Sequence, residues 1–267
     1  MRADQQPRRR SVNLILLEPS EVSGTNVVTL SGPRAAHMLK VLRVTPGLQV
    51  RVGVLDGPRG IATVDGIRDE AVTLSCMFDV IAPARPPVDL LLATPRPKVM
   101  RRLWAQIAAL GVGRIILTNA EKVERNYFDT HMLEPGTYRP LLIEGLQQAR
   151  DTRMPSVSIY RRFKVLIEDE LDQLVGPALR IVADPSAATP VTEIVRRSRE
   201  PRILLAIGPE GGWNAFELDL LAAHGFQSAG MGPRTLRTDT ACVALLAIGH
   251  SAIRAREISE GRVQTSD

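Results

Sequence analysis

The chain has 267 residues, of which 44% are hydrophobic and 24% charged, a composition typical of a folded globular protein and not of a disordered chain. No stretch approaches about 18 consecutive apolar residues and no apolar segment follows the basic start, so neither a membrane span nor a secretory signal is predicted. Cys76 and Cys242 lie far apart, which argues against a disulfide framework and favours the cytoplasm. Lysine and arginine exceed aspartate and glutamate by 34 − 29 = 5, a mild excess compatible with a nucleic-acid partner.

The N-terminal part is predicted to be a basic arm followed by a small β-domain. Residues 1–10 include three consecutive arginines and are expected to form a flexible arm, either a solvated terminus or a contact for RNA. In residues 11–82, short alternating or β-branched runs are separated by turn signals, which is typical of a small β-barrel or sandwich. One helix is expected at residues 33–44. The expected strands lie at residues 13–19, 27–30, 48–56, 60–67 and 71–81.

A proline-rich linker at residues 82–87 separates this region from one with a different pattern. In residues 88–258, short buried-strand runs alternate with helical patterns, of which the first is at residues 97–110. The alternation predicts an α/β domain with a largely parallel sheet. The expected strands lie at residues 90–94, 114–118, 156–160, 178–184, 202–208 and 227–232.

The most informative segment is the sequence Ile-Gly-Pro-Glu-Gly-Gly-Trp at residues 207–213. It follows a buried strand, and its three glycines allow positive φ angles and the close approach of a ligand. Asn214 and Glu217 have the spacing of an N-cap and its capping-box partner, so a helix is expected to begin there. Ligands of open α/β sheets bind outside the carboxyl ends of the strands. The loop is therefore a candidate binding site, although a plain strand-to-helix turn would have similar residues.

A second Gly-Pro loop follows the next predicted strand, within residues 231–241. It carries two arginines, and Thr238 is the expected N-cap of a long helix at residues 239–256. That helix is apolar on nearly all sides, which predicts burial in a core or in a subunit interface. Because Arg237 lies between a glycine loop and a buried helix, a role in a site is favoured over a capping or surface role.

Two further segments are candidate contacts for RNA. Lys98, Arg101 and Arg102 share one face at the start of a predicted helix, where phosphate would bind; the alternative is an ordinary exposed basic face. The segment at residues 147–155 ends another helix with polar groups that would meet RNA; the alternative is an ordinary helix end.

Known nucleotide and metal motifs are missing from the sequence. There is no P-loop, no dinucleotide fingerprint after a strand and no nucleophile elbow. His37, His131, His224 and His250 are scattered, without cysteine or carboxylate ligands at metal-binding spacing. No metal site is therefore predicted.

The order of the two glycine-rich loops resembles the C-terminal signature of the 16S ribosomal RNA uridine N3-methyltransferase family (the RsmE type), which belongs to the SPOUT class. The second loop reads Met-Gly-Pro-Arg-Thr-Leu-Arg-Thr-Asp-Thr-Ala. The likeness covers nearly the whole chain, since residues 37–47, the Asp56-Gly57 turn, Lys98 and residues 110–112 are similar to other motifs of the family.

The chain departs from the family pattern at three places. The family's helix-end motif E-Q-[SC]-x-R is represented only by Gln147 and Arg150. Asp239 stands where the family has a longer glutamate, and Ala109 stands where it usually has Glu. These departures concern the details of substrate binding more than the class of reaction.

The resemblance implies a SPOUT domain with a mostly parallel sheet and a deep trefoil knot, preceded by a PUA-like β-barrel that binds RNA. It also implies a homodimer that uses S-adenosylmethionine and acts on 16S rRNA of the small ribosomal subunit, without metal or membrane. The residues expected to bind the cofactor are Ala183, Asp184, Ile207, Gly208, Gly211, Gly212, Met231, Gly232, Leu236, Thr238 and Ala241.

The implied reaction moves a methyl group to N3 of a uridine, which must first lose a proton. Arg237 is expected to stabilise the developing negative charge, and either Glu210 or Asp239 to accept the proton; a structural role for Asp239 is the alternative. Ribose 2′-O-methylation of rRNA or tRNA, or a non-catalytic assembly factor, are the competing functions. The expected RNA contacts are His37, Lys40, Arg43, Lys98, Arg101, Arg102, Arg150 and Arg153.

Overall fold

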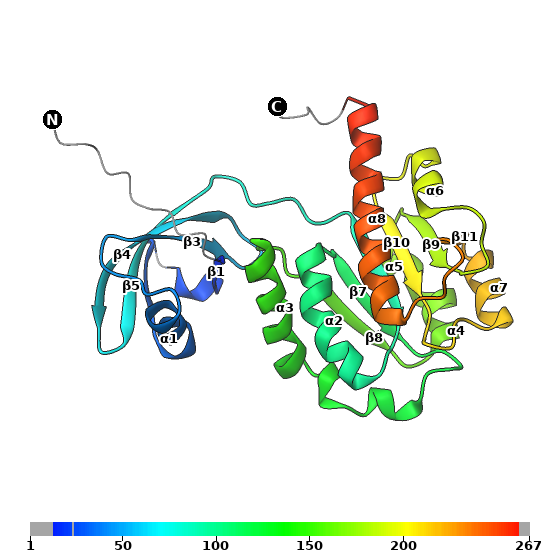
Figure 1. Cartoon of the computed structure of the whole chain (residues 1–267), viewed down its shortest axis with the longest axis horizontal. Coiled ribbons are helices and arrows are strands. Elements are labelled where there is room, and N and C mark those ends of the chain that lie inside the picture. The colour runs from blue at the N-terminus through cyan, green and yellow to red at the C-terminus, as the bar shows by residue number, and fades with distance from the viewer. Residues whose placement is uncertain (1–12, 23, 262–267) are drawn as a thin grey trace. The chain divides into compact units, whose positions relative to one another are not determined.

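The computed structural model describes residues 13–22 and 24–261, and the chain forms two units that are shown in Figure 1. The first unit comprises the chain up to residue 84 together with residues 143–154, and the second comprises residues 85–142 and the chain from residue 155 onward. The boundary near residue 84 lies in the proline-rich linker. The return of residues 143–154 to the first unit has no signal in the sequence pattern. The predicted arm at residues 1–10 lies outside the described residues.

The first unit is built on a five-stranded sheet in the order β1-β3-β4-β5-β2. All its pairs are antiparallel except β1 with β3, and α1 (Gly32–Lys40) and a short 3-10 helix η1 (Pro19–Glu21) accompany the sheet. Each predicted strand of this region is present, in most cases in a shorter form, and the predicted helix ends a turn early. The strands are β1 (Ile15–Leu17), β2 (Val27–Leu30), β3 (Gln49–Val54), β4 (Arg59–Arg68) and β5 (Ala71–Phe78).

Alternation along the strands explains where the core of this unit lies. In β5, Val72, Leu74 and Cys76 are buried while the residues between them are more exposed, as expected for a sheet with one face on a core. Met38 of α1 belongs to the same hydrophobic cluster. The unit is therefore a sheet that is covered on one face by a short amphipathic helix.

Residues 150–153 are bound to the turn between β3 and β4. Thr152 is fully buried; its hydroxyl donates to the Gly57 carbonyl at 2.7 Å, and its own carbonyl accepts from the Asp56 backbone N–H at 2.8 Å. The Arg153 guanidinium donates to the carbonyls of Asp56 and Pro83. Arg150 adopts a left-handed φ of 57° directly after the helix. The polar run that was a candidate RNA contact thus contains residues that stabilise the first unit.

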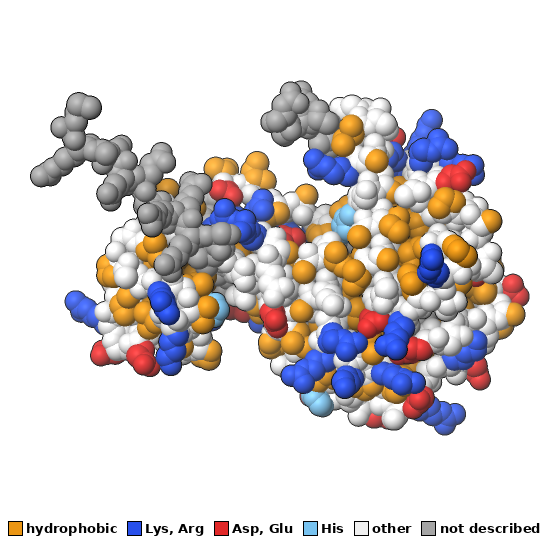
Figure 2. Space-filling model, in the orientation of Figure 1, with side chains coloured by type: hydrophobic (Ala, Val, Ile, Leu, Met, Phe, Trp, Pro, Cys, Tyr) orange, Lys and Arg blue, Asp and Glu red, His pale blue; other side chains and the backbone are white. Residues whose placement is uncertain are grey.

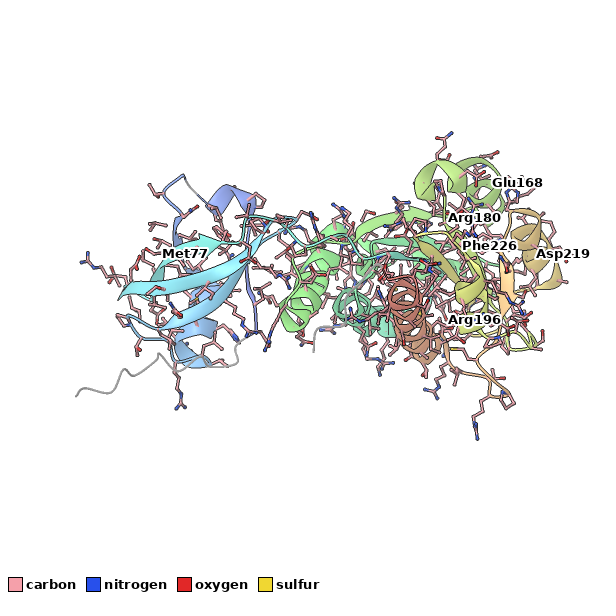
Figure 3. The ribbon with its side chains drawn as sticks, turned by 90° about the horizontal axis from the view of Figure 1, so that it is seen from above. Met77, Glu168, Arg180, Arg196, Asp219 and Phe226 are labelled. Atoms are coloured by element: carbon pink, nitrogen blue, oxygen red, sulfur yellow. The ribbon has the colours of Figure 1, made fainter. Side chains whose placement is uncertain are left out.

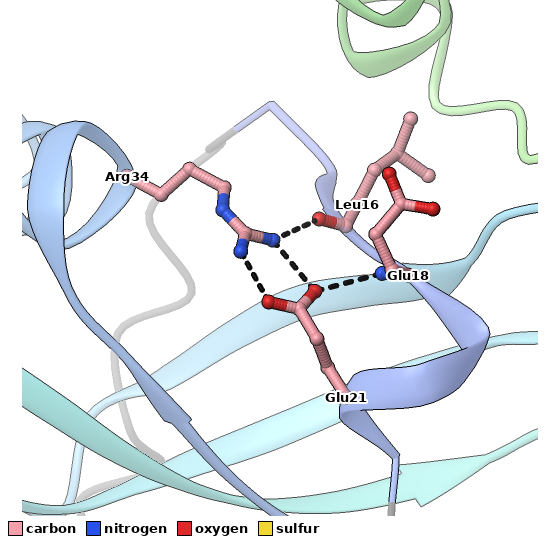
Figure 4. A network of polar contacts seen from close by, with 4 residues as sticks. All are labelled: Leu16, Glu18, Glu21 and Arg34. Carbon is pink, nitrogen blue, oxygen red and sulfur yellow. Dashed lines mark hydrogen bonds and ion pairs between the residues drawn. The ribbon is translucent and has the colours of Figure 1, made fainter.

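An ion pair fastens α1 to the chain after β1. The Arg34 guanidinium binds both carboxylate oxygens of Glu21 and donates to the Leu16 carbonyl at 3.1 Å, while the backbone N–H of Glu18 donates to Glu21 at 2.8 Å (Figure 4). The Arg34 guanidinium holds the pKa of the Glu21 carboxyl below its ordinary value. A bidentate, charge-assisted pair of this kind fixes orientation as well as contributing energy.

Replacement of Glu21 by glutamine is expected to lower the stability of the first unit by about 1 kcal/mol at neutral pH, because the pair is partly exposed and screened by solvent. A carboxyl whose pKa is lowered in the folded state stabilises the fold at pH values above its pKa in the unfolded chain. That stabilisation is lost as the pH falls through the pKa of the folded state. Hydrogen–deuterium exchange of strands β2–β5 between about pH 7 and pH 3 measures this. In the wild type, the protection of the backbone amides from exchange should decrease toward low pH. In Glu21→Gln, this decrease should be smaller. A Glu70→Gln control, at an exposed turn, should match wild type.

The second unit contains six parallel strands in the order β11-β9-β10-β6-β7-β8, all of which were predicted. The strands β6 and β10 lie in the middle and are completely buried, as is usual for parallel sheets with helices on both faces. After β6 the chain continues to β7 on one side of this pair, and after β10 it continues to β11 on the other side. The strands are β6 (Val88–Ala93), β7 (Arg114–Thr118), β8 (Ser156–Tyr160), β9 (Leu179–Ala183), β10 (Ile203–Ile207) and β11 (Gln227–Ala229).

Helices connect these strands, and none within the described residues is long and apolar enough to cross a membrane. The helix predicted at residues 97–110 has those bounds in the structure. The helical elements are α2 (Pro97–Leu110), η2 (Arg125–Phe128), η3 (His131–Leu133), α3 (Pro135–Ala149), α4 (Phe163–Val165), the π-helix η4 (Leu166–Glu170), α5 (Leu171–Val175), α6 (Val191–Arg197), α7 (Ala215–Ala223) and α8 (Thr238–Ser259).

The long helix α8 lies over β10 and β6, between α2 and α6 (Figure 1). Gly249 faces Leu205 and Val88 at this contact, where a Cβ would lie at ordinary van der Waals distances of 3.6 and 3.9 Å. The predicted burial is confirmed for one face, and burial of the other face in a subunit interface stays a prediction. Val243, Ala247 and Ile258 are exposed on the single chain.

At the edge of the sheet, β11 pairs with β9, and the side chain of Arg180 in β9 contacts the turn that precedes β11. Its guanidinium donates to the His224 carbonyl at 2.9 Å and lies 6.0 Å from the centre of the Phe226 ring (Figure 3). The turn between α7 and β11 is thereby bound to β9. This contact matters for function because the chain leaves β11 directly into the second glycine-rich loop.

Candidate active site

A pocket lies where β9, β10 and β11 end, at the carboxyl edge of the sheet. It is formed by three segments that are distant in sequence: the end of β9, the loop after β10 and the loop after β11. The lining residues are Ala183, Asp184, Pro185, Ile207, Gly208, Pro209, Glu210, Gly212, Trp213, Leu218, Ala229, Met231, Gly232, Arg234, Thr235, Leu236, Thr238 and Ala241. Crevices at this edge are the usual ligand sites of open α/β sheets.

The loop after β10 is a tight turn beneath the indole of Trp213. A Cβ at Gly208 would lie 3.1 Å from that ring, and Gly212 has a φ of +70° and donates its N–H to the Pro209 carbonyl at 2.8 Å. Glycine is therefore favoured at both positions, at the first by close packing and at the second by backbone conformation. Gly211 instead accepts at its carbonyl from the Lys122 ammonium at 2.7 Å, and it alone among the expected cofactor residues is not part of the pocket lining.

The predicted capping box at the start of α7 is confirmed. The Asn214 side chain accepts from the Glu217 N–H, and the Glu217 carboxylate accepts from the Asn214 N–H, both at 2.8 Å. The second oxygen of Glu217 accepts from the backbone N–H of Glu121 at 2.7 Å. Glu217 is buried, and its carboxylate links the loop after β10 to the loop after β7.

The loop after β11 approaches the segment after β9 very closely. The Gly230 N–H donates to the Thr189 carbonyl at 3.0 Å, and a Cβ on Gly230 would lie 2.1 Å from the carbonyl oxygen of Ala187. Gly232 then has a φ of +101°. Only glycine fits at these positions, which explains the Gly-rich pattern in physical terms.

The expected role of Thr238 as N-cap is wrong. The N-cap residue of α8 is Arg237, and Thr238 is the first residue of the helix. The buried Thr238 hydroxyl donates to the Gly208 carbonyl at 3.3 Å. The threonine therefore links the two glycine-rich loops instead of capping the helix.

The three charged residues expected to be catalytic occupy different environments. Glu210 is exposed and lines the pocket, and Arg237 is exposed directly before α8, outside the pocket lining. Asp239 pairs with Arg102 of α2 at 2.9 Å, and its other oxygen accepts from the Thr240 N–H at 2.9 Å. Both oxygens of Asp239 are thus already hydrogen-bonded, and the structural alternative for this residue gains support.

The expected RNA contacts fall into groups. His37 and Lys40 are exposed on α1, and Arg43 follows that helix. Arg101 and Lys98 are exposed at the start of α2, where Figure 2 shows Lys and Arg side chains gathered on the surface. Arg102 lies on the same face but is paired with Asp239, and Arg153 donates to backbone carbonyls.

Sequence reasoning missed several residues of the pocket. Pro185, Thr235 and Arg234 adjoin predicted residues, so the loop boundaries alone were a sufficient signal for them. Leu218 reaches the pocket from α7 and Ala229 from within β11, and only the tertiary structure reveals them.

Thiol and metal chemistry have no visible site in the described residues. No three His, Cys, Asp or Glu side chains lie together as a metal site in the described part of the chain. Burial raises the pKa of the Cys76 thiol to about 11 and also raises the pKa of Cys242. Both thiols are therefore protonated at neutral pH and are poor nucleophiles.

A parallel α/β sheet with a glycine-rich pocket at its carboxyl edge defines a cofactor-binding α/β protein. The model of the RNA methyltransferase domain family matches residues 83–250, and the chain belongs to this family. The resemblance to the RsmE type is also confirmed by the curated relatives.

Two relatives and one solved structure illustrate the similarity. Ribosomal RNA small subunit methyltransferase E of Treponema pallidum is 29% identical over 90% of this chain and 92% of its own length. Ribosomal RNA small subunit methyltransferase E 1 of Borreliella burgdorferi is 24% identical over 87% of this chain and 95% of its own length. The crystal structure of ribosomal RNA small subunit methyltransferase E from Neisseria gonorrhoeae, bound to S-adenosylmethionine, has a TM-score of 0.72 at 21% identity. It covers 90% of this chain and 97% of that one, and it shows the shared fold.

Proposed function

We propose that the protein is an S-adenosylmethionine-dependent methyltransferase that methylates N3 of a uridine in the 16S rRNA of the small ribosomal subunit. The observation that carries this proposal is the composition of the pocket. Of the eleven residues that the family resemblance assigns to the cofactor, ten line this one pocket, although they come from three distant segments. The names of the full-length relatives agree with this substrate.

The pocket has the chemistry that the cofactor needs. Ile207, Leu236 and Met231 offer apolar surface for the adenine ring, and the glycines expose backbone N–H and carbonyl groups to its edge. Asp184 provides carboxylate oxygens for ribose hydroxyls, and one of them already accepts from the N–H and hydroxyl of Ser186. When bound, S-adenosylmethionine supplies a methyl group on a sulfonium, which is an activated electrophile.

The protein must then position the uracil and manage its proton. A cation that lies where negative charge develops stabilises that charge, and we assign this role to Arg237, which directly precedes α8. Glu210 is the better candidate for the base, because it is exposed at the pocket whereas both oxygens of Asp239 accept hydrogen bonds. N3 lies on the pairing edge of the base, so the uridine must be unpaired when it enters.

The finer architecture belongs to the same proposal. The chain passes from β11, at one edge of the sheet, through residues 230–237 to α8 above the central strands. We assign to this passage the deep trefoil knot of the SPOUT class, within a domain at residues 88–258. The region at residues 11–82, which contains the five-stranded sheet, is assigned as the PUA-like RNA-binding domain.

We also propose that the protein acts as a homodimer in the cytoplasm. The exposed face of α8 carries Val243, Ala247 and Ile258, and apolar surface on a long helix is suited to burial against a second copy. The cytoplasm is the compartment of the proposed ribosomal substrate.

The deciding experiment is incubation with labelled S-adenosylmethionine and small ribosomal subunits that lack the modification, with naked rRNA and tRNA in parallel. Mass spectrometry of the digested RNA then identifies the modified nucleoside. N3-methyluridine from the subunits supports the proposal. A ribose-methylated nucleoside would overturn the assignment of the target atom, and the absence of label together with absence of cofactor binding would favour a non-catalytic assembly factor.

Replacing Lys98 and Arg101 together by glutamate is expected to weaken binding to small subunits by at least about tenfold at low salt and to reduce the salt dependence of binding. Both side chains are exposed and neither forms part of the pocket. Arg102 is left intact because its ion pair with Asp239 would confuse the result. A filter-binding titration in increasing salt measures the effect. A slope equal to that of wild type would locate the phosphate contacts elsewhere.

A further inference from the structure

A second cavity of about 370 Å³ lies within the first unit, between one face of α1 and the last turns of α3. It is separate from the cofactor pocket and shares no lining residue with it. The residues that carry its chemistry are His37 and Met38 of α1, Glu144, Gln147 and Gln148 of α3, and Leu14 before β1.

The cavity joins two sequence motifs that the proposed reaction does not use. One is the segment of α1 around His37, and the other is the polar run that begins at Gln147. Glu144, Gln147 and Gln148 lie at positions i, i+3 and i+4, so they share one face of α3. More than a hundred residues of sequence separate the two helices at this cavity.

The cavity is lined by polar side chains from α3 on one side and has an apolar floor. Leu14 and Met38 are nearly fully buried and provide the floor. The amide groups of Gln147 and Gln148 both donate and accept hydrogen bonds, and the carboxylate of Glu144 accepts them. No hydrogen bond within the described part of the chain engages the side chains of these three residues. A flat ligand with apolar faces and a mixed donor–acceptor edge fits this arrangement.

A phosphate does not fit the cavity as well. Its one guanidinium, that of Arg34, is bound to both carboxylate oxygens of Glu21 and to the Leu16 carbonyl (Figure 4). Glu144 adds a negative charge to the opposite wall. The exposed cations Lys40 and Arg43 follow the lining residues of α1 in the chain and lie outside the lining.

The walls are held in place before any ligand binds. The Leu14 N–H donates to the Gln147 carbonyl at 3.1 Å, which ties the floor to the end of α3. Thr152 and Arg153 bind the chain after α3 to the turn between β3 and β4. A preorganised cavity loses less conformational entropy when it binds a ligand.

We propose that this cavity binds an unpaired nucleobase of the RNA substrate, at a position other than the methylated uridine. RNA is usually read through single-stranded bases whose edges are hydrogen-bonded in pockets of this kind. The inference rests on the proposed function, since it adds a second recognition site for the same RNA. It assigns Glu144, Gln147 and Gln148 as specificity-determining residues.

The first test compares the methylation kinetics of Glu144→Ala/Gln148→Ala with wild type on unmodified small subunits. Both side chains are exposed, so the fold should be retained. KM for the subunits is expected to rise at least about tenfold, the loss that follows from a lost base-edge contact, with kcat and cofactor affinity within about twofold. The matched control is Glu168→Ala/Gln173→Ala, an exposed pair in the other unit, which should behave as wild type. An unchanged KM in the cavity variant would overturn the proposal.

The second test does not depend on methyl transfer. A photoreactive benzoylphenylalanine at position 148 is irradiated in the presence of small subunits, and the crosslinked nucleotide is mapped by reverse transcription. A crosslink to one unpaired nucleotide of 16S rRNA, other than the target, is expected. Crosslinks to ribosomal protein alone, or the absence of any crosslink to RNA, would refute the base site. If wild type makes no N3-methyluridine but the crosslink to rRNA persists, the proposed reaction fails while the binding site stands.

Discussion

Arg237→Ala is expected to slow methyl transfer by at least about a hundredfold while leaving the affinity for S-adenosylmethionine within about twofold. The side chain is exposed at the N-cap position of α8 and does not form part of the pocket lining, so its loss removes no cofactor contact and no core packing. In the proposed mechanism, the variant lacks the cation that is assigned to stabilise the uracil anion as charge develops. Single-turnover kinetics on small subunits, with calorimetric titration of the cofactor, separates the two effects.

The control for this experiment is Arg199→Ala, an exposed arginine that precedes β10, whose other end carries the first loop; this variant should retain wild-type rates. Arg237→Lys should recover part of the rate, since it restores the charge without the planar fork of guanidinium donors. A rate for Arg237→Ala equal to that of wild type would remove this residue from the mechanism.

Gly230→Ala is expected to weaken binding of S-adenosylmethionine by at least about tenfold. The added Cβ would lie 2.1 Å from the Ala187 carbonyl oxygen, a distance that the backbone can relieve only by moving. Either the segment after β9, which carries Asp184, or the loop after β11, which carries Met231, must shift. Overpacking of this kind costs about 1–3 kcal/mol, so the melting temperature should also fall.

A glycine with free space provides the comparison for this variant. No atom lies within 4 Å of a Cβ built on Gly136, and its φ angle is not in the left-handed region. Gly136→Ala should therefore keep both cofactor affinity and stability. Isothermal titration with S-adenosylmethionine measures the affinity of each variant. Wild-type affinity in Gly230→Ala would mean that the two segments are not in contact when the cofactor is bound.

Local sequence patterns were sufficient for much of the second unit. The six strands, the helix at residues 97–110 and the capping box of Asn214 with Glu217 all follow from runs of apolar residues and from residues that end them. Gly208 and Gly212 stood out because glycine is conspicuous in a strand-to-helix loop. These features depend on neighbours within a few residues, and a sequence displays such neighbours directly.

Contacts between distant segments were decided only by the tertiary structure. The sequence does not reveal the order of β9, β10 and β11 in the sheet. That order brings the two glycine-rich loops together, so the Thr238 hydroxyl donates to the Gly208 carbonyl and does not cap its own helix. In the same way, the sequence makes Asp239 a candidate base, but in the structure it is paired with Arg102, more than a hundred residues away. The return of residues 143–154 to the first unit likewise depends on buried hydrogen bonds to a turn far earlier in the chain. Such pairings are selected by the packing of the whole core, and no local propensity encodes them.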